Sequence, residues 1–388
     1  MEKRISIIFE SDIYAQYGVF NSVRNRVLYL SKIADYVIDV YIVTKYLPWY
    51  LRLLRNINKQ DRKKEIILDG ITYHILWYRK SILEHIITEW FRLPPYFLNR
   101  FICRMAKEMR NYDFLSVHSG LAGKIAQKTK ELYHIPYCIT WHGSDIHTHP
   151  FQSKLAFAQT KLLLNNAYCN FFVSQALCDK ATTITDSFRS EILYNGINSK
   201  FCCYSVEEKK KLRKTKGVPD GKKVVAFCGA LLDVKNPLSL PPIFKSVMDN
   251  RENNLIFWII GDGPLKPQVE SEAESLHLPC VFWGNLPAEE MPVMMNCIDV
   301  LVLPSKKEGL PLVVIEALAC GSNVVGSNVG GIKEAAGEDN VFDLDDSFVS
   351  QISTRINYLL HHTVEQPLNE VFDWKKTASK EKSVYNSI

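Results

Sequence analysis

Residues 299–334 read DVLVLPSKKEGLPLVVIEALACGSNVVGSNVGGIKE, and this stretch carries the clearest structural signals in the chain. The aliphatic run 300–303 stops at a Pro-Ser pair, as a buried strand does when it ends at a turn. Pro311 suits the first turn of a helix and Gly321 suits a left-handed C-terminal cap, so we expect a helix of roughly ten residues between them. The stretch therefore predicts a buried strand followed by a capped helix.

Two acidic residues mark this helix. Glu308 precedes it, and Glu316 lies inside it among neighbours that are apolar on every side. A buried carboxylate needs hydrogen-bond donors, so its partner is either a structural cation or a ligand with hydroxyl groups. Gly309 and Leu310 favour a ligand, because free N–H groups at a helix N-terminus attract an anion such as a diphosphate. A diphosphate combined with hydroxyl groups indicates a nucleotide sugar.

Length and composition predict a folded, soluble chain of two domains. The 388 residues are 47% hydrophobic and 23% charged, and no apolar run approaches the roughly 20 residues of a membrane span. The apolar run near the N-terminus is too short for a signal peptide, so we expect a cytoplasmic protein. The ten cysteines include no CxxC pair, which argues against a zinc or disulfide framework. We expect no metal and no other cofactor.

The first half of the chain alternates between expected strands and helices. Residues 4–9 form a strand, Gly18 lies in the next loop, and residues 20–33 form a helix. Further strands are expected at residues 37–44, 114–118, 137–141, 170–174 and 192–196. Residues 66–75 read as a β-hairpin about an Asp-Gly turn.

Two of these strands end in a histidine. His118 closes VHSG, and His142 begins the HGSD segment with Gly143 and Asp145. Ligands of open α/β sheets bind at the carboxyl ends of strands, so we expect these four residues to border a cleft, with His142, Gly143 and Asp145 on its acceptor side and His118 as a candidate catalytic residue. The alternative is that each histidine is only hydrogen-bonded within its loop.

Residues 45–110 are basic and rich in aromatic side chains. They contain fourteen Lys and Arg against six Asp and Glu, together with aromatic residues such as Trp49, Trp90 and Phe97. Basic and aromatic residues on amphipathic helices suit an anionic membrane surface. Alternatively, the apolar stripes face the domain core and the cations are solvated. No recognition motif supports nucleic acid as a partner.

The second half opens with the strand 224–229, whose last residue is Gly229, and Lys235 follows it. Another strand is expected at 255–260, before the glycine-rich turn GDGPL. The polar run 207–216 before this half marks the linker region and reads as a solvated helix.

These motifs resemble those of the retaining glycosyltransferases of family 4. The spacing of Glu308 and Glu316 matches the E-x7-E signature of that family, and Gly330, Gly331 and Glu334 follow as in its members. The resemblance implies the α/β fold called GT-B, in which two Rossmann-like domains face each other across a cleft. The implied domains are an acceptor-binding domain at 1–200, a nucleotide-sugar-binding domain at 201–365, and a C-terminal helix at 366–388 that returns to the first domain.

The resemblance also implies roles for single residues. Lys235 and the N–H groups of Gly309 and Leu310 would hold the diphosphate, and Glu316 would hold the ribose. Glu308 would contact the donor sugar, and His118 would orient it. Gly18 and Gly229 correspond to glycines that approach the donor. The donor would be a UDP or GDP sugar, transferred with retention and without a metal.

One position departs from the family pattern. Members usually carry an arginine where this chain has Ala230, and that arginine pairs with the donor diphosphate together with the lysine that matches Lys235. A lost charge-assisted hydrogen bond costs about 1.5–3 kcal/mol, so the departure weakens the expected donor affinity.

We therefore expect an enzyme that transfers a hexose to a glycan or lipid-linked acceptor in bacterial envelope polysaccharide synthesis, whether capsule, exopolysaccharide or lipopolysaccharide. Such an enzyme could bind peripherally to the inner face of the cytoplasmic membrane. Two alternatives stay open at this point. One is a nucleotide-sugar epimerase of the same fold, and the other is a non-catalytic subunit that binds the donor.

Overall fold

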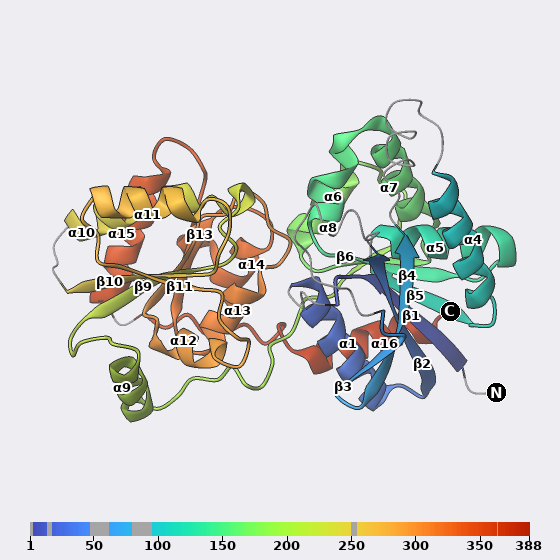
Figure 1. Ribbon diagram of the computed structural model, residues 1–388, viewed down its shortest axis with the longest axis horizontal. Coiled ribbons are helices and arrows are strands. Elements are labelled where there is room, and N and C mark those ends of the chain that lie inside the picture. The colour runs from blue at the N-terminus through green and yellow to red at the C-terminus, as the bar shows by residue number, and fades with distance from the viewer. Residues whose placement is uncertain are drawn as a thin grey trace. The chain divides into compact units, whose positions relative to one another are not determined.

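The computed structural model of the protein describes residues 3–13, 18–46, 62–79, 95–118, 120–249, 254–362 and 364–388. Contacts divide the chain into two compact units (Figure 1). The first unit comprises Met1–Val173, Leu177–Leu193 and Trp374–Ile388, and the second comprises Ser174–Ala176 and Tyr194–Asp373. The C-terminal helix therefore belongs to the first unit.

The described residues of the first unit form an eight-stranded sheet in the order β3-β4-β2-β1-β5-β6-β7-β8. Among these described strands, β3 runs antiparallel to β4 and the other neighbours are parallel. Every residue of β5 and β6 is buried, as expected for strands covered on both faces. The strands are β1 (Lys3–Glu10), β2 (Tyr36–Tyr46), β3 (Glu65–Leu68), β4 (Ile71–Arg79), β5 (Phe114–His118), β6 (Tyr137–Trp141), β7 (Cys169–Phe172) and β8 (Ser190–Ile192).

Helices connect these strands. They are α1 (Val19–Ile33), α4 (Tyr96–Met109), α5 (Gly120–Tyr133), α6 (Ser144–His147), the 3-10 helix η1 (His149–Gln152), α7 (Lys154–Asn166), α8 (Gln175–Thr182) and α16 (Trp374–Asn386). The hairpin prediction is confirmed: Asp69 and Gly70 both have positive φ, 52° and 78°, which matches the right-handed twist of the paired strands.

The strand predicted at 192–196 is wrong, because β8 ends at Ile192. Beyond that point the chain leaves the first sheet. The Tyr194 hydroxyl donates to Glu334 and the Ile197 N–H donates to the Phe372 carbonyl. These partners lie far away in the sequence, so local pattern could not reveal them.

The second unit is a six-stranded, fully parallel sheet in the order β11-β10-β9-β12-β13-β14. Its strands are β9 (Lys223–Cys228), β10 (Leu255–Ile260), β11 (Cys280–Gly284), β12 (Val300–Leu303), β13 (Asn323–Ser327) and β14 (Val341–Phe342). Its helices are α9 (Val206–Thr215), α10 (Leu240–Asp249), α11 (Lys266–Ser275), α12 (Met291–Cys297), α13 (Leu312–Ala319), α14 (Ile332–Ala336) and α15 (Phe348–His361), with 3-10 turns η2 (Asp233–Lys235), η3 (Pro237–Ser239) and η4 (Glu338–Asn340).

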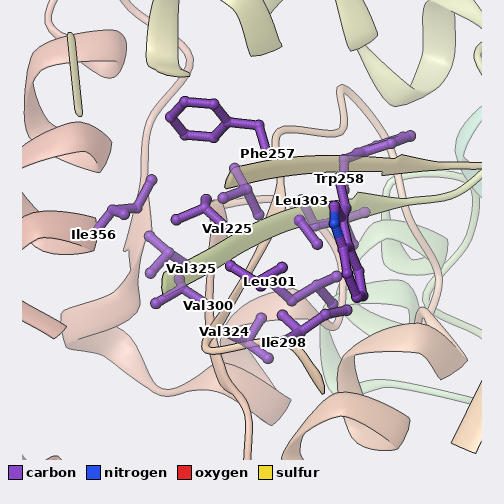
Figure 2. Packing of buried hydrophobic residues seen from close by; sticks show 14 of the residues in the cluster. Val225, Phe257, Trp258, Ile298, Val300, Leu301, Leu303, Val324, Val325 and Ile356 are labelled. Atoms are coloured by element: carbon purple, nitrogen blue, oxygen red, sulfur yellow. The ribbon is translucent and has the colours of Figure 1, made fainter. Parts of the chain in front are cut away.

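The core of the second unit consists of aliphatic and aromatic side chains from the central strands and the covering helices. Figure 2 shows Val325 of β13 close to Ile356 of α15. Phe257 stacks on Phe244 of α10, with ring centroids 4.3 Å apart. Full burial of one such side chain contributes about 1.5–3 kcal/mol, so this core fixes the sheet whose loops carry the predicted donor residues.

A buried ion pair joins α16 to the first unit. Arg26 of α1 and Glu381 of α16 are each 1% exposed, and the Arg26 Nε lies 3.5 Å from Glu381 Oε2. Arg26 also donates to Thr140 Oγ1 at 2.8 Å, while the Tyr385 hydroxyl donates to Glu381. Burial of the two charges is costly, and their mutual attraction offsets part of that cost, so removal of either partner alone would destabilise the packing of α16 on α1.

Replacement of Arg26 by methionine should lower the free energy of unfolding by about 3–5 kcal/mol, since it leaves the Glu381 carboxylate buried without its cation. The double variant Arg26→Met/Glu381→Leu should recover most of that loss. Chemical denaturation followed by circular dichroism measures both. The matched control is Lys380→Ala, which removes an exposed pair with Glu191 and should cost under about 1 kcal/mol. Equal losses in Arg26→Met and Lys380→Ala would contradict the assignment.

Candidate functional site

The predicted donor residues of the second unit lie at the carboxyl ends of β9 and β12. The strand order reverses between these two strands, and in open α/β sheets a ligand binds at such a reversal. Lys235 lies in the loop after β9, at the end of η2. Glu308 lies in the loop after β12, four residues before α13 begins at Leu312. The topology therefore brings together two residues that are 73 positions apart in the sequence.

Lys235 and Glu308 form an ion pair. The Lys235 Nζ lies 2.5 Å from Glu308 Oε1, and Ser305 Oγ donates to the same oxygen at 2.7 Å. The Glu308 side chain is 8% exposed and that of Lys235 is 25% exposed. The pair is thus largely shielded from water, which strengthens the attraction between the two charges.

The two loops are also joined through their backbones. The Lys306 N–H donates to the Val234 carbonyl at 2.9 Å, and the Lys306 Nζ lies 2.6 Å from Asp233 Oδ1. Ala230, in the same loop after β9, is exposed and provides no cation. The charge of Lys306 is paired with Asp233, so these contacts link the two loops without adding an unpaired cation.

Glycines allow the loops to approach each other closely. Gly330 has φ of 54°, and a Cβ there would lie 2.1 Å from the Glu308 carbonyl oxygen. The Gly331 N–H donates to the Gly309 carbonyl at 2.6 Å. At the start of the loop after β9, the Gly229 carbonyl oxygen would lie 2.0 Å from a Cβ on Gly261. Any larger residue at Gly330 or Gly261 would displace a loop that carries a predicted donor residue.

The helix after Glu308 has the expected form. α13 begins after Pro311, and Gly321 has the positive φ of 79° expected of a left-handed cap. Gly309 and Leu310 are buried at its N-terminal end. Their N–H groups are the ones that, by the family resemblance, would hold the diphosphate.

Glu316 lies in the middle of α13 and is half-buried. Burial raises its pKa to about 7. In the part of the chain that the structure describes, no hydrogen bond or ion pair to its carboxylate is found. Cys228, at the end of β9, lies within electrostatic reach of both Glu316 and Lys235. The alternative interpretation requires an internal cation next to Glu316. Among the described residues, no such cation is found.

In the first unit, His118 and His142 lie side by side at the ends of β5 and β6. His118 Nδ1 and His142 Nε2 are 3.0 Å apart, and the rings stack with centroids 5.2 Å apart. Burial lowers the pKa of His118 well below its usual range, and the charges of His142 and Arg26 lower it further. Burial and Arg26 lower the pKa of His142 to about 3. Both rings are therefore neutral at pH 7, and one ring donates an N–H hydrogen bond to the other.

Asp145 shapes the turn that follows His142. Its carboxylate accepts the N–H of Gly143 at 2.7 Å and the N–H of His142 at 2.9 Å. Gly143 has φ of 150°, a value that L side chains rarely adopt. This carboxylate therefore holds the His142 backbone in place, in addition to any role toward a ligand.

Gly18 is the N-cap of α1, with φ of 52°, and it is exposed. Sequence reasoning missed Glu10, which ends β1 at the strand reversal of the first unit. Its carboxylate accepts the Leu121 N–H of α5 at 3.3 Å and lies 3.0 Å from the Lys45 Nζ. The available signal was an acid directly at the end of a buried strand, in RISIIFE.

Part of the predicted basic aromatic surface, residues 45–46, 62–79 and 95–110, lies within the described residues. Phe101, Met105 and Met109 of α4 are buried, so this apolar stripe faces the core. Tyr96 and Phe97, at the start of α4, are 65% and 59% exposed. The predicted residues Trp49 and Trp90 lie outside the described residues. None of the helices in the described ranges combines the length and apolar character needed to cross a membrane.

Comparison with protein families identifies the second half of the chain. Residues 208–378 match the model of the family described as glycosyl transferases group 1. The match covers under half of the chain and includes the loops that carry Lys235 and Glu308. The prediction of a glycosyltransferase is confirmed, whereas the assignment to family 4 stays a prediction.

The chain is also similar in sequence to proteins that are named as glycosyltransferases. The chain is 26% identical over 370 residues to a putative teichuronic acid biosynthesis glycosyltransferase of Bacillus subtilis, and the match covers 94% of this chain and 90% of that protein. It is also 26% identical over 273 residues to the UDP-Gal:alpha-D-GlcNAc-diphosphoundecaprenol alpha-1,3-galactosyltransferase of Escherichia coli, covering 66% and 68% of the two chains.

Solved structures confirm the fold class. Sucrose-phosphate synthase from Thermosynechococcus elongatus superimposes with a TM-score of 0.77 at 16% identity, covering 100% of this chain and 99% of that one. The Anabaena protein HepE in complex with UDP gives a TM-score of 0.75 at 16% identity, with both chains fully covered. The glycosyltransferase thus has the predicted GT-B-like fold of two Rossmann-like domains, while the cleft between them stays a prediction.

The raised pKa of Glu316 makes stability depend on pH. Between its usual pKa of 4.5 and its folded pKa of about 7, the folded chain holds a proton that the unfolded chain has released. The free energy of unfolding should therefore fall by up to about 3 kcal/mol as the pH rises from 4.5 to 7. Urea denaturation across this range measures it, and Glu316→Gln should lack this component. Parallel curves for the two proteins would show that Glu316 does not titrate there.

Proposed function

We propose that this glycosyltransferase moves a sugar from a UDP or GDP sugar to a glycan or lipid-linked acceptor, with retention of the anomeric configuration. The observation that carries the proposal is the unpaired carboxylate of Glu316 beside the Lys235–Glu308 ion pair, at the strand reversal of a parallel sheet. An acid kept in an apolar helix without an internal cation is suited to accepting hydrogen bonds from the ribose hydroxyls.

The cations at the loops after β9 and β12 are assigned to the diphosphate. When it binds, the Lys235 ammonium exchanges part of its contact with Glu308 for a phosphate oxygen. Glu308 then accepts hydrogen bonds from hydroxyls of the donor sugar. The N–H groups of Gly309 and Leu310 stabilise the charge that grows on the leaving diphosphate. Because these groups neutralise the leaving group, we propose that no metal is required, and chelators such as EDTA should leave turnover unchanged.

The transfer itself is assigned to a front-face displacement. Glu308 is largely covered and ion-paired, so it is suited to holding the sugar rather than attacking it. Since Glu316 is assigned to the ribose, no carboxylate among the described residues is assigned as nucleophile, and the departing diphosphate and the entering hydroxyl share one face of an ion-pair-like sugar cation. His118, neutral at pH 7, orients the reacting sugar through a hydrogen bond rather than through a positive charge.

Similar proteins support the donor and acceptor classes. HepE is described in complex with UDP and with UDP-glucose. The relative from Escherichia coli is named for a galactosyl transfer to a diphosphoundecaprenol-linked sugar, and that from Bacillus subtilis for teichuronic acid synthesis. For this chain we propose a bacterial envelope polysaccharide as the product and the cytoplasmic face of the membrane as the place of synthesis.

Incubation of the pure protein with UDP, GDP and ADP sugars should give binding or nucleotide release with one donor class, measured by calorimetry and mass spectrometry. Glu316→Ala should weaken donor binding at least about tenfold, because it removes charge-assisted hydrogen bonds to the ribose. Donor turnover in Glu316→Ala equal to the wild type would end the proposal. A new sugar nucleotide formed without an acceptor and seen by NMR would identify an epimerase instead.

A gain-of-function variant accompanies this screen. Ala230→Arg places a guanidinium in the loop that holds Lys235, and it should tighten donor binding about tenfold or more. The exposure of Ala230 leaves room for the larger side chain. Unchanged affinity would mean that this loop does not face the diphosphate.

We further propose that residues 45–110 bind an anionic membrane surface, supported by the exposed Tyr96 and Phe97 at the start of α4. In a flotation assay the protein should rise with vesicles that contain phosphatidylglycerol and stay behind with neutral vesicles. Phe97→Ser should reduce flotation, whereas Leu132→Ser, which alters an exposed apolar residue of α5, should not. Equal recovery with both vesicle types would contradict the proposal.

A further inference from the structure

A hollow of about 370 Å³ opens in the second unit between α9 and the turn that leads into β9. Its helix wall carries Lys209, Lys210 and Arg213, which helical spacing places on neighbouring faces of α9. Val218 and Pro219 line the side of the turn, and Val218 is almost fully buried. The volume lies near the lower end of the roughly 300–1,000 Å³ typical of sites for small ligands.

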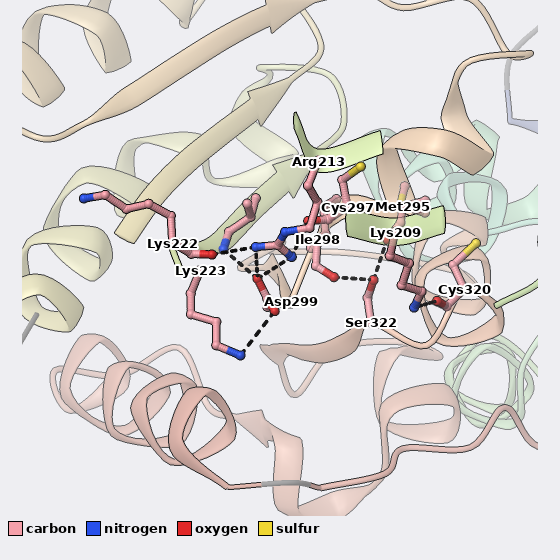
Figure 3. Close-up of polar contacts among 11 residues, drawn as sticks. Lys209, Arg213, Lys222, Lys223, Met295, Cys297, Ile298, Asp299, Cys320 and Ser322 are labelled. Carbon is pink, nitrogen blue, oxygen red and sulfur yellow. Dashed lines mark hydrogen bonds and ion pairs between the residues drawn. The ribbon is translucent and has the colours of Figure 1, made fainter. Parts of the chain in front are cut away.

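Two of the three cations are fixed in position. The Lys209 Nζ donates to the Cys320 carbonyl at 2.7 Å. The Arg213 guanidinium donates to the carbonyls of Cys297 and Lys222 at 3.0 and 2.7 Å (Figure 3). Because these side chains are already ordered, a ligand that meets them would pay little conformational entropy.

The charges around the hollow do not balance. Asp299 is shared between Arg213, at 2.9 Å, and Lys223, at 3.5 Å. Lys209 is held by a carbonyl, and Lys210 is exposed with no ion pair among the described residues. Figure 3 shows the Lys222 ammonium pointing away from Arg213. The charged residues that line the hollow are Lys209, Lys210, Arg213 and Lys222 against Asp220, and Asp299 adds a second carboxylate through its pair with Arg213.

Four cations against two carboxylates leave a net charge of +2 at a concave surface, where field lines are focused. The acids of the first turn of α9 do not line the hollow, and Glu208 is engaged in a capping box with Ser205. We propose that this hollow is a binding site for a small phosphate-bearing anion, such as a di- or polyphosphate. Lys210, which has no ion pair among the described residues, would donate to the phosphate oxygens, while Lys209 and Arg213, whose N–H groups already bond carbonyls and Asp299, contribute mainly their charge.

The site is separate from the donor loops. Lys223 is the first residue of β9, and Asp299 directly precedes β12. Lys235 and Glu308 follow the opposite ends of the same two strands. A six-residue strand spans about 20 Å, so one small anion cannot contact both places.

The test compares two charge reversals on one helix. Lys210 lines the hollow, whereas Lys211 is equally exposed on α9 but does not line it. Both are made in a Lys235→Ala background, which removes the donor-site lysine, and calorimetry measures the affinity for pyrophosphate. Lys210→Glu should weaken binding at least about tenfold, while Lys211→Glu should change it less than about twofold. Circular dichroism checks that each variant is folded.

A second arm identifies the source of the phosphate. Vesicles with and without phosphatidylglycerol are offered to the same variants. A loss specific to Lys210→Glu with pyrophosphate supports a soluble anion, and the same loss with vesicles alone supports a lipid headgroup. Equal losses in both variants, or binding that disappears with Lys235→Ala itself, would overturn the site. Since no donor sugar is used, failure of this experiment leaves the proposed transfer untouched, and the reverse also holds.

Discussion

The ion pair between Lys235 and Glu308 holds the loops after β9 and β12 together, and the predicted donor site depends on it. Both charges are largely shielded from water, and Ser305 and the backbone bond from Lys306 to Val234 fix the same arrangement. In the proposed function, a diphosphate that approaches Lys235 competes with a carboxylate already in place. Donor affinity would then be a difference between two ion-pair energies, and the lack of an arginine at Ala230 would make that difference smaller.

The chain contains two acids in apolar surroundings that are used in different ways. Burial raises the pKa of both acids, but Glu381 has Arg26 and Tyr385 beside it, and these partners offset part of the cost of its burial. Glu316 has no such partner among the described residues. Its carboxylate therefore depends on donors from outside the chain, either water or, in the proposed function, a ligand.

The two histidines of the first unit are also buried polar groups, but they are uncharged. Burial and Arg26 keep His118 and His142 uncharged, and Asp145 fixes the backbone that carries His142. A neutral, ordered imidazole offers a directional hydrogen bond at the end of a strand. The amino edge of the other sheet is built differently, because cations there are anchored by carbonyls and remain only partly neutralised. The carboxyl edge of the first sheet therefore offers neutral hydrogen-bonding groups, whereas the amino edge of the second sheet offers positive charge.

The sequence by itself determined most element types, the α13 helix with Glu308 before it and Glu316 inside it, and the glycosyltransferase prediction. These depend on local properties: periodicity, a capping glycine and a fixed spacing along the chain. Only the tertiary structure decided that Lys235 meets Glu308, that β8 stops at Ile192, and that Arg26 pairs with Glu381. Those contacts join residues that are far apart in the chain, and their existence depends on strand order and on which side chains lose their water. A sequence pattern specifies neither of these, because both are properties of the packed sheet.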